Sequence, residues 1–556
     1  MFRRRIRRTY RFHEIDPDEV LVDASNLPSF EPGHMEGRLE RPIGDGAFLG
    51  LGIVIALVLA GLLGRAWYLE VERGPSYAAI SEQNQLDSSV LFADRGVITD
   101  RNGVPLVTNV ALPDGSVRRL YRSPGFSNVL GYVSYPRKDS NGNYYDTDIT
   151  GLAGIEKSEN ALLAGQNGTL LVEKDALGRV VSQGKVIPPV NGKSLRLTID
   201  ARVEQAMYDA IQQVSERMRF NSGGGIIMDV RTGELLALVS YPQYDSNVLS
   251  SGGPSSTIAL YNTDPRHVYL NRPVQGLYTP GSVVKTIEAA GALTDGVITP
   301  DYTINDTGSI SVPNPYDPAH PNIFVDWKVL GTENLEKAIA WSSDVYFYMV
   351  GGGYGGIKGL GIDRLAYWFK SFGFDSATGV ALPGENSGFV PTPAWKEAAY
   401  GKAWNIGDTY HTAIGQYAVQ VTPIELTRAI AAVANDGTLL TPTLLEGEPV
   451  QGTRVPASAS ALAVARAGMR LSVTSALASP LDFPYVEVAA KTGTAQVGVN
   501  NEYDNAWVEG FFPYQDPKYA FVVVLERGPS GSGEQGVSVM QQVFTELEQT
   551  APEYFK

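Results

Sequence analysis

The longest uninterrupted apolar stretch of the chain runs from Ala47 to Leu63 (AFLGLGIVIALVLAGLL) and has no charged side chain. A membrane-spanning helix needs about 17 to 25 residues, and this stretch reaches Leu69 if Arg65 extends its charged end to the lipid headgroups. Its eleven Leu, Ile, Val or Phe residues favour insertion by about 3 to 7 kcal/mol. The pattern predicts one transmembrane anchor over residues 47–69. The stretch is too long for a cleaved signal peptide, which is the alternative.

Charges on the two sides of this anchor give only a slight preference for its orientation. Arg38 and Arg41 lie before it, and Arg65 and Arg73 balance them after it. Because positive residues collect on the cytoplasmic side, the arginines further upstream tip the prediction toward a cytoplasmic tail over residues 1–46.

Short alternating segments separated by turn residues follow the anchor. Gly96 to Thr99 and Val104 to Val107 flank an Asn-Gly pair, which is typical of a β-hairpin. The region up to about Gly192 is rich in Gly, Asn, Asp and Pro, with one helix-like segment from Ile155 to Leu163. This composition predicts a β-rich spacer module over residues 70–193, which is called the pedestal below.

The pattern changes near Leu195, where a strand leads into an amphipathic helix (LRLTIDARVEQAMYDAIQQV). The segment IIMDVRTGELLALVS then predicts a hairpin that turns at Arg231-Thr232-Gly233. Strands and helices alternate irregularly from there, without a repeat of fixed period. We therefore expect an α/β (α+β) domain over residues 194–556.

Composition excludes several classes of protein. A chain of 556 residues exceeds one hydrophobic core, and a net charge of −15 argues against nucleic-acid binding. The chain has no cysteine, and its five histidines form neither an HExxH pair nor a His-x-His cluster, so we expect no metal site. Gly192-Lys193-Ser194 is not a phosphate loop because Ile187 stands where the first glycine is needed, so no nucleotide cofactor is expected either.

The first candidate for chemistry is Ser282, in the segment YTPGSVVK followed by TIEAAGAL. Pro-Gly before an alanine-rich run indicates the start of a helix, whose free N–H groups and dipole stabilise an alkoxide. Lys285 follows three residues later on the same helix face, so its amine can accept the Ser282 proton if burial keeps it neutral part of the time. Ser-x-x-Lys is weak evidence alone. A second copy, Ser182 to Lys185, lies in a Gly- and Pro-rich turn region and is expected to be a coincidence.

The second candidate is Ser342-Ser343-Asp344, between two apolar helix-like runs. A hydroxyl and a carboxylate two residues apart can face one cleft. Ser342 would then relay a proton to a leaving amine, and Asp344 would hold Lys285 in place. Taken alone, the triplet is more often a helix cap. A similar triplet, Ser158 to Asn160, occurs in the wrong order along the chain.

The third candidate is Lys491-Thr492-Gly493-Thr494, after the strand-like residues 485–490. A strand edge with hydroxyls and no side chain at Gly493 can receive an extended peptide by backbone pairing. Lys491, Thr492 and Thr494 would bind its terminal carboxylate, and the N–H groups of Thr494 and Ser282 would form an oxyanion hole. Lys491 alone is equally consistent with a solvated lysine.

The three motifs in this order are those of penicillin-binding proteins and class A β-lactamases. From about Tyr68 to Leu547 the chain resembles class B penicillin-binding proteins of the elongation type, known as penicillin-binding protein 2. The segments that carry this resemblance are RGVITDRNGVPL, GLAGIEKSENALLAGQNG, GIDRLAYWFKSFGF, KAWNIGDTYHTAIGQYAVQVTPIEL and NAWVEGFFPYQDPKYAFVVV. Asp344, where most relatives have Asn, is itself similar to the elongation branch.

The sequence departs from this family at Tyr417, because relatives usually have a second glycine after Gln416. Trp404 and Gly407-Asp408-Thr409 look like a segment of the family's cleft, and we expect them to be structural rather than catalytic. The tail, residues 1–45, has no counterpart in the resemblance.

The resemblance implies a penicillin-binding/β-lactamase-like serine acyltransferase domain that acts as a peptidoglycan D,D-transpeptidase. Its donor would be a stem peptide ending in D-Ala-D-Ala, and Ser282 would form the acyl-enzyme with donors and with β-lactams. The resemblance also implies a single-pass protein of the cytoplasmic membrane with an extracytoplasmic catalytic domain. Its implied partner is a multi-spanning glycan polymerase of the elongation machinery.

Other proteins with these motifs remain as alternatives. A D,D-carboxypeptidase or a β-lactam-binding sensor would share all three, although the first 46 residues are short for a signalling module. A class A β-lactamase should carry a Glu-x-x-Leu-Asn element, which we do not find. A scaffold without activity is disfavoured by the intact motifs, and about 125 residues between anchor and catalytic domain leave no room for a glycosyltransferase domain.

Overall fold

The computed structural model describes residues 44–556, except for 79–85, 113–115, 123, 141, 175–179, 315–316 and 534. The tail predicted over residues 1–46 therefore lies almost wholly outside the described residues. Contacts divide the chain into two units, residues 1–87 with 173–182, and residues 88–172 with 183–556. Each unit is described by itself.

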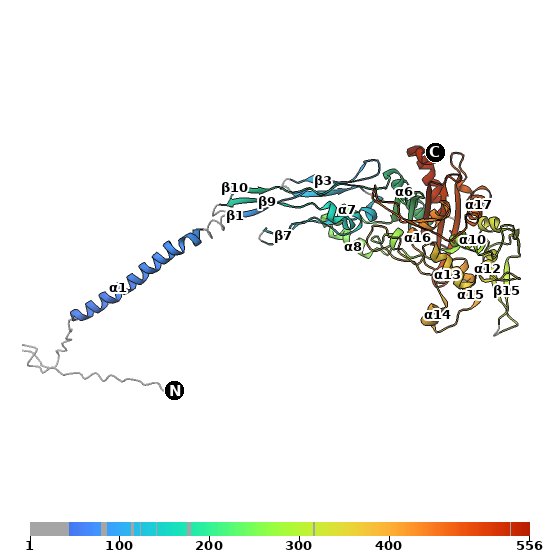
Figure 1. Cartoon of the computed structure of the whole chain (residues 1–556), viewed down its shortest axis with the longest axis horizontal. Helices are drawn as coiled ribbons and strands as arrows, with labels where there is room; N and C mark the ends of the chain where they lie inside the picture. Colours follow the sequence, from blue (N-terminus) through green and yellow to red (C-terminus); the bar gives the residue numbers. More distant parts are fainter. Residues whose placement is uncertain are drawn as a thin grey trace, which may run out of the picture. The chain divides into compact units, whose positions relative to one another are not determined.

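The first unit contains the long helix α1 (Asp45–Trp67), which continues as a π-helical turn, η4 (Tyr68–Glu72). α1 is one continuous helix with no buried residue (Figure 1). Within the described part of the chain, the segment Asp45–Glu72 is the only helix long and apolar enough to cross a membrane. The prediction of one candidate span is confirmed.

The pedestal begins the second unit and is built on a four-stranded sheet in the order β11-β2-β3-β4. Its strands are β2 (Ile98–Thr99), β3 (Pro105–Ala111), β4 (Val117–Tyr121) and β11 (Leu195–Arg196). β2 and β3 form the predicted hairpin, with Gly103 at φ +81° in its turn. The predicted helix over Ile155–Leu163 is instead two short helices, α4 (Gly154–Ser158) and α5 (Asn160–Leu163), which are separated at Glu159.

A buried ion network organises the centre of this domain. Arg95 and Arg119 each approach the Glu156 carboxylate at 2.6 Å, and none of the three side chains is exposed. Because two cations share one carboxylate, loss of Glu156 would leave both buried and without a counter-charge. The network joins β4, α4 and the residues before β2 into one support.

The domain predicted over residues 194–556 is built on a five-stranded antiparallel sheet in the order β13-β12-β22-β21-β20. Its strands are β12 (Ser222–Asp229), β13 (Leu235–Tyr241), β20 (Ala489–Val497), β21 (Tyr503–Phe512) and β22 (Tyr519–Pro529). β12 and β13 form the predicted hairpin. β20 is an edge strand, so one side of it is free of strand partners.

Helices cover both faces of this sheet (Figure 1). α6 (Ala201–Met218) and α18 (Gln535–Thr550) pack on one face, because side chains such as Phe521 and Val523 point toward them. α16 (Pro423–Ala434) packs on the other, where Val522 and Val524 point. On this second side, α17 (Ala459–Ser475) links β20 to α10 (Lys285–Thr294) and α11 (Leu335–Trp341).

Other helices and strands complete the described part of the chain. The helices are α3 (Ser127–Leu130), α7 (Ser246–Ser251), α8 (Ser255–Thr263), α9 (Arg272–Gln275), η5 (Gly281–Val284), α12 (Asp344–Gly352), α13 (Gly361–Ser371), α14 (Pro393–Tyr400), α15 (Ile406–Ala413), η6 (Ser479–Leu481) and η7 (Pro552–Phe555). The strands are β1 (Leu86–Leu91), β5 (Val133–Ser134), β6 (Arg137–Lys138), β7 (Tyr144–Asp146), β8 (Thr150–Gly151), β9 (Gly168–Lys174), β10 (Val180–Ile187), β14 (Ile304–Asp306), β15 (Ser309–Val312), β16 (Asn322–Val325), β17 (Gly331–Glu333), β18 (Thr438–Leu440) and β19 (Gly452–Arg454).

Candidate active site

Ser282 lies in a tight 3-10 turn, η5, which leads directly into α10. The sequence predicts Ser282 inside the first turn of the α-helix, whereas the α-helix begins at Lys285. The reason is Gly281, whose φ of +62° bends the chain just before the serine. Ser282 is partly exposed and lines the cleft, while Val283 and Val284 are buried beneath it.

Lys285 is fully buried at the start of α10. Its Nζ donates to the Ser342 carbonyl oxygen at 2.8 Å, to Asp344 Oδ1 at 2.5 Å and to Ser342 Oγ at 3.4 Å. Among the described residues these are its hydrogen-bond acceptors, so the predicted contact with Ser282 Oγ is absent from this arrangement. These three acceptors fix the position of the amine at the start of α10.

The Ser342-Ser343-Asp344 corner lies between α11 and α12. Ser342 ends α11 in a left-handed conformation, with φ +60°. Ser343 caps α12 by accepting a hydrogen bond from the Tyr346 N–H at 3.0 Å. The capping role therefore falls to the middle residue, which leaves Ser342 and Asp344 to line the cleft.

Asp326, which lies outside the three motifs, stabilises this corner through hydrogen bonds to its carboxylate. Asp326 Oδ2 accepts hydrogen bonds from Ser343 Oγ at 3.2 Å and from the Val345 N–H at 2.8 Å. Burial raises the pKa of Asp326 above its usual range, and burial raises the pKa of nearby Glu333 to about 7. In both cases desolvation of the carboxylate is the largest cause of the raised pKa.

Lys491, Thr492, Gly493 and Thr494 lie within the edge strand β20, which agrees with the strand edge that the sequence predicts, although the strand begins only at Ala489. Thr492, Gly493 and Thr494 line the cleft. Lys491 does not line it: its side chain is fully buried and donates to the Thr492 carbonyl at 2.6 Å. Neighbouring residues of a strand face opposite sides, and Lys491 lies beneath the threonines that line the cleft.

Close packing joins the serine turn to this strand. A Cβ on Gly281 would lie 2.5 Å from the Thr494 carbonyl oxygen, and a Cβ on Gly493 would lie 2.8 Å from Val283 Cγ1. Both contacts are shorter than real Cβ atoms allow. The two glycines therefore bring the backbone of Ser282 and the backbone of Thr494 together, as an oxyanion hole requires.

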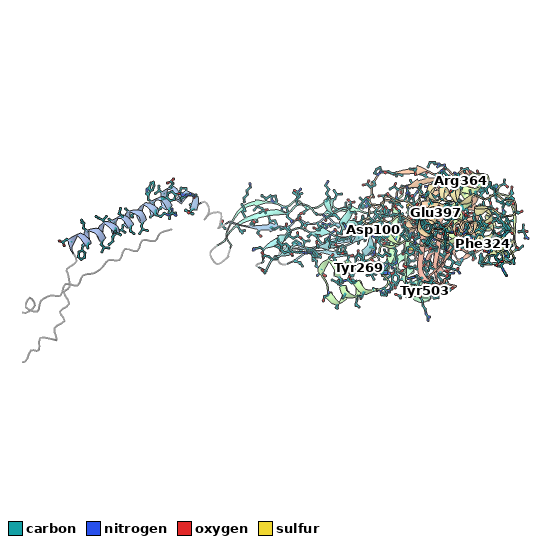
Figure 2. All side chains as sticks on the ribbon, turned by 90° about the horizontal axis from the view of Figure 1, so that it is seen from below. Asp100, Tyr269, Phe324, Arg364, Glu397 and Tyr503 are labelled. Atoms are coloured by element: carbon teal, nitrogen blue, oxygen red, sulfur yellow. The ribbon has the colours of Figure 1, made fainter. Side chains whose placement is uncertain are left out.

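The cleft has a volume of about 1400 Å³, and its lining includes Ser282, Ser342, Asp344, Thr492, Gly493, Thr494, Ile323, Phe324, Val325, Trp327, Asn405, Gly407, Asp408, His411, Gln416 and Tyr417. Phe324 of β16 packs edge-on against Tyr348, Tyr410 and His411. In Figure 2, Phe324 lies toward one end of the second unit, and Asp100 lies nearer the middle of that unit. Burial lowers the pKa of His411, which favours its neutral form. No group of three or more His, Asp or Glu side chains suited to a metal ion occurs among the described residues.

The residues of this site lie within a segment that matches a known protein family. The family described as the penicillin binding protein transpeptidase domain matches residues 223–547, and the penicillin-binding protein dimerisation domain matches residues 110–197. The chain belongs to the penicillin-binding protein transpeptidase family. The resemblance suggested by the motifs is confirmed.

Relatives and solved structures of the penicillin-binding protein 2 type are among the similar proteins. "Peptidoglycan D,D-transpeptidase MrdA" of Escherichia coli K12 is 29% identical over 614 residues, covering 90% of this chain and 93% of that protein. The protein of the same name from Haemophilus influenzae is 32% identical over 469 residues, covering 77% of this chain and 69% of its own.

Among solved structures, that of PBP2 with MreC from Helicobacter pylori has a TM-score of 0.70 at 28% identity and covers 84% of this chain and all of its own. Pseudomonas aeruginosa PBP2 with WCK 5153 has a TM-score of 0.68 at 28% identity, covering 83% of this chain and 96% of that one. A chain of a peptidoglycan synthase complex has a TM-score of 0.70 at 26% identity and covers 90% and 98%.

Tyr417 stands where relatives usually have glycine, and its backbone conformation is one that favours glycine. Its φ is +65°, a conformation that glycine adopts freely and a bulky side chain does not. Its ring lines the cleft and packs edge-on against Trp395 and Trp404. The Asp408 carboxylate, in turn, pairs with Lys396 and caps α15, which agrees with a structural part for this segment.

Sequence reasoning missed two buried carboxyls behind the serine. Glu288 lies one turn after Lys285, and Glu509 lies on β21; neither is exposed. Burial raises the pKa of each well above its usual range. The spacing of Glu288 from Lys285 was a visible signal, whereas Glu509 is brought near the site only by strand pairing.

Gly281→Ala should lower acylation of this penicillin-binding protein by β-lactams by at least about 10²-fold, because the added Cβ pushes the Ser282 turn away from Thr494 and small displacements of reacting groups are that costly. The rate of covalent labelling by a fluorescent penicillin measures this. Gly296→Ala is the matched control, since Gly296 also has a positive φ (+68°) but nothing within 4 Å. Gly296→Ala should lower the stability of the protein by the same ~1–2 kcal/mol, because a non-glycine residue is strained at positive φ. It should be labelled at the wild-type rate. Equal labelling by both variants would contradict the proposed close contact.

Proposed function

We propose that this penicillin-binding protein cross-links peptidoglycan through an acyl-enzyme intermediate on Ser282. The chain is a serine-type peptidoglycan D,D-transpeptidase by its family and relatives. One observation supports the assignment of residues. Ser282, Ser342, Asp344 and the Thr492–Thr494 strand edge line one cleft, and Lys285 lies beneath it, bonded to both Ser342 and Asp344.

In the first step, Ser282 Oγ attacks the penultimate carbonyl of a stem peptide that ends in D-Ala-D-Ala. Lys285, as the neutral amine, accepts the serine proton. The oxygen of the tetrahedral intermediate accepts hydrogen bonds from the N–H groups of Ser282 and Thr494. The C–N bond then breaks, and Ser342 Oγ, bonded to Lys285 at 3.4 Å, passes a proton to the departing D-Ala amine.

The terminal carboxylate of the donor binds at the strand edge. The Thr492 and Thr494 hydroxyls contact it from the cleft, and Lys491 supplies positive charge from below. The donor backbone extends along β20, which has no strand partner on that side. β-Lactams, which carry a carboxylate next to a reactive amide, bind in the same place.

In the second step, the amine of a neighbouring stem peptide attacks the acyl-serine ester, so that a new amide forms and Ser282 is released. The acyl-enzyme conserves the energy of the broken peptide bond, and the reaction needs neither ATP nor a cofactor. The attacking amine loses a proton, which Lys285 accepts and then gives to Ser282 Oγ as the ester C–O bond breaks.

The proposed activity fits a division of the chain into four parts. We divide it into a cytoplasmic tail (1–46), an anchor in the cytoplasmic membrane (47–69), a pedestal (70–193) and an extracytoplasmic transpeptidase domain (194–556). The candidate span Asp45–Glu72 supports the anchor. Similar structures in complex with MreC and in a peptidoglycan synthase complex support a multi-spanning glycan polymerase of the elongation machinery as the partner.

Product analysis separates cross-linking from hydrolysis. With a native stem-peptide donor and an amine acceptor, we expect the full chain to form cross-linked dimer and release D-Ala in equal amounts. The cross-linked dimer and the released D-Ala are each quantified by chromatography. Release of D-Ala without dimer at every acceptor concentration would identify a D,D-carboxypeptidase. Penicillin binding without release of D-Ala would identify a sensor.

A further inference from the structure

Glu509 is an acid inside the antiparallel sheet. It lies on β21 between Val508 and Gly510, where a buried strand normally carries apolar residues, and it is not exposed at all. Thr286 Oγ1 donates to Glu509 Oε1 at 3.1 Å, and Oε2 has no partner among the described residues. The carboxyl is thus held at one oxygen and available at the other.

The register of the sheet pairs this acid with the lysine of the third motif. Glu509 lies directly opposite Lys491 across β21 and β20, so both side chains are on the same face of the sheet. Directly opposite Cβ atoms are about 4.5–5.5 Å apart, which lets a flexible lysine reach the neighbouring carboxyl. Lys491 donates to the Thr492 carbonyl, and the register makes Glu509 its direct cross-strand neighbour on the same face of the sheet.

Burial disfavours the charged form of both Glu509 and Lys491. Burial raises the pKa of Glu509 well above its usual range, and burial together with Lys285 lowers that of Lys491 well below its own. The ionisable groups that face Lys491 are Lys285 of α10, Glu509 of β21 and Asp344 of α12, and Glu288 faces Lys285 from the same helix. With the cleft empty, an uncharged carboxyl beside an uncharged amine is the favoured state.

An anion in the cleft reverses this preference. A carboxylate held by Thr492 and Thr494 lies above Lys491, and it favours an ammonium beneath it. A buried lysine has no direct access to protons from water. The carboxyl directly across the strand, whose Oε2 has no partner among the described residues, is the source that the register provides.

We propose that Glu509 is a positioning residue that gives its proton to Lys491 when a donor carboxylate or a β-lactam carboxylate enters the cleft. The O–H bond of the Glu509 carboxyl breaks and an N–H bond of Lys491 forms, so the pair passes from two neutral groups to an ion pair without taking a proton from water. The inference rests on the proposed function, because it requires an anionic ligand at the strand edge. Through Glu509, strand β21 contributes to recognition of that anion.

The test compares the pH dependence of acylation in Glu509→Gln and in the wild type. Glutamine preserves the size of the side chain and an oxygen for Thr286, but it has no proton to give. Lys491 must then be charged from solvent, so the wild-type to variant ratio of acylation efficiency should rise with pH, approaching tenfold per pH unit above the pKa of the lysine. Fluorescent penicillin labelling of the full chain from about pH 6 to pH 9 measures the ratio.

Glu204→Gln is the matched control. Glu204 is also fully buried and accepts a hydrogen bond from a backbone N–H, that of Leu238, but it belongs to α6. Its ratio to the wild type should not change with pH. A flat ratio for Glu509→Gln as well would overturn the inference while leaving the proposed function intact. Absence of wild-type labelling would instead refute the proposed function itself.

Infrared difference spectra of the wild type provide a readout that does not depend on folding of the variant. Acylation by a penicillin should remove the signal of a protonated carboxyl and produce that of a carboxylate. Glu288→Gln, which removes the other buried acid near Lys285, should retain this change. Spectra with no loss of a protonated carboxyl would overturn the inference.

Discussion

Replacing Lys285 by alanine should slow acylation of Ser282 by more than the ~10²- to 10⁴-fold typical of a lost acid or base. The amine of Lys285 is the base nearest the serine turn, and it also fixes the geometry of the second motif through the Ser342 carbonyl and Asp344. Its removal leaves Asp344 without its partner at 2.5 Å and Ser342 without a proton donor or acceptor. Proton transfer and orientation are lost together.

The rate constant for labelling by a fluorescent penicillin measures this effect. Lys185→Ala is the matched control, because Lys185 belongs to the other Ser-x-x-Lys pair and is exposed on β10, which is a strand and not the turn that the sequence suggests. It should label like the wild type. Wild-type rates in Lys285→Ala would remove Lys285 as the base.

Ser282→Ala should abolish covalent labelling altogether, an effect larger than that of any other single change. Ser282 is the hydroxyl that opens the turn before α10, and its backbone adjoins Thr494 through Gly281. Ser342 also lines the cleft, but its hydroxyl is bonded to Lys285 and its left-handed backbone serves the corner between α11 and α12. Ser182→Ala, in the other Ser-x-x-Lys pair, should label normally.

The three motifs and their order were enough to predict the grouping of Ser282, Ser342, Asp344 and Thr492 around one cleft. Local patterns also gave the β12–β13 hairpin and the anchor helix, because both depend on residues close in sequence. The direction in which each side chain points was not contained in the motifs. Lys491 lies under the cleft because strand residues alternate, and the position of Lys285 depends on a corner some 57 residues away.

Features that depend on distant pairing could not be predicted at all. Glu509 faces Lys491 only because β21 pairs with β20 in one register, and a shift by one residue would turn it to the other face. The order of the sheet likewise pairs β12 with β22, which joins Ser222 to Glu526. Tyr417 was recognised as a departure from the family, but its positive φ became visible only in the backbone.

The position of the β-lactam adduct tests the central claim most directly. After labelling, the full chain is digested and the modified peptide is sequenced by mass spectrometry. We predict a single acyl group on Ser282, in the peptide that also contains Lys285. An adduct on Ser342, on Ser182 or on any other residue would contradict the assignment of Ser282 as the nucleophile.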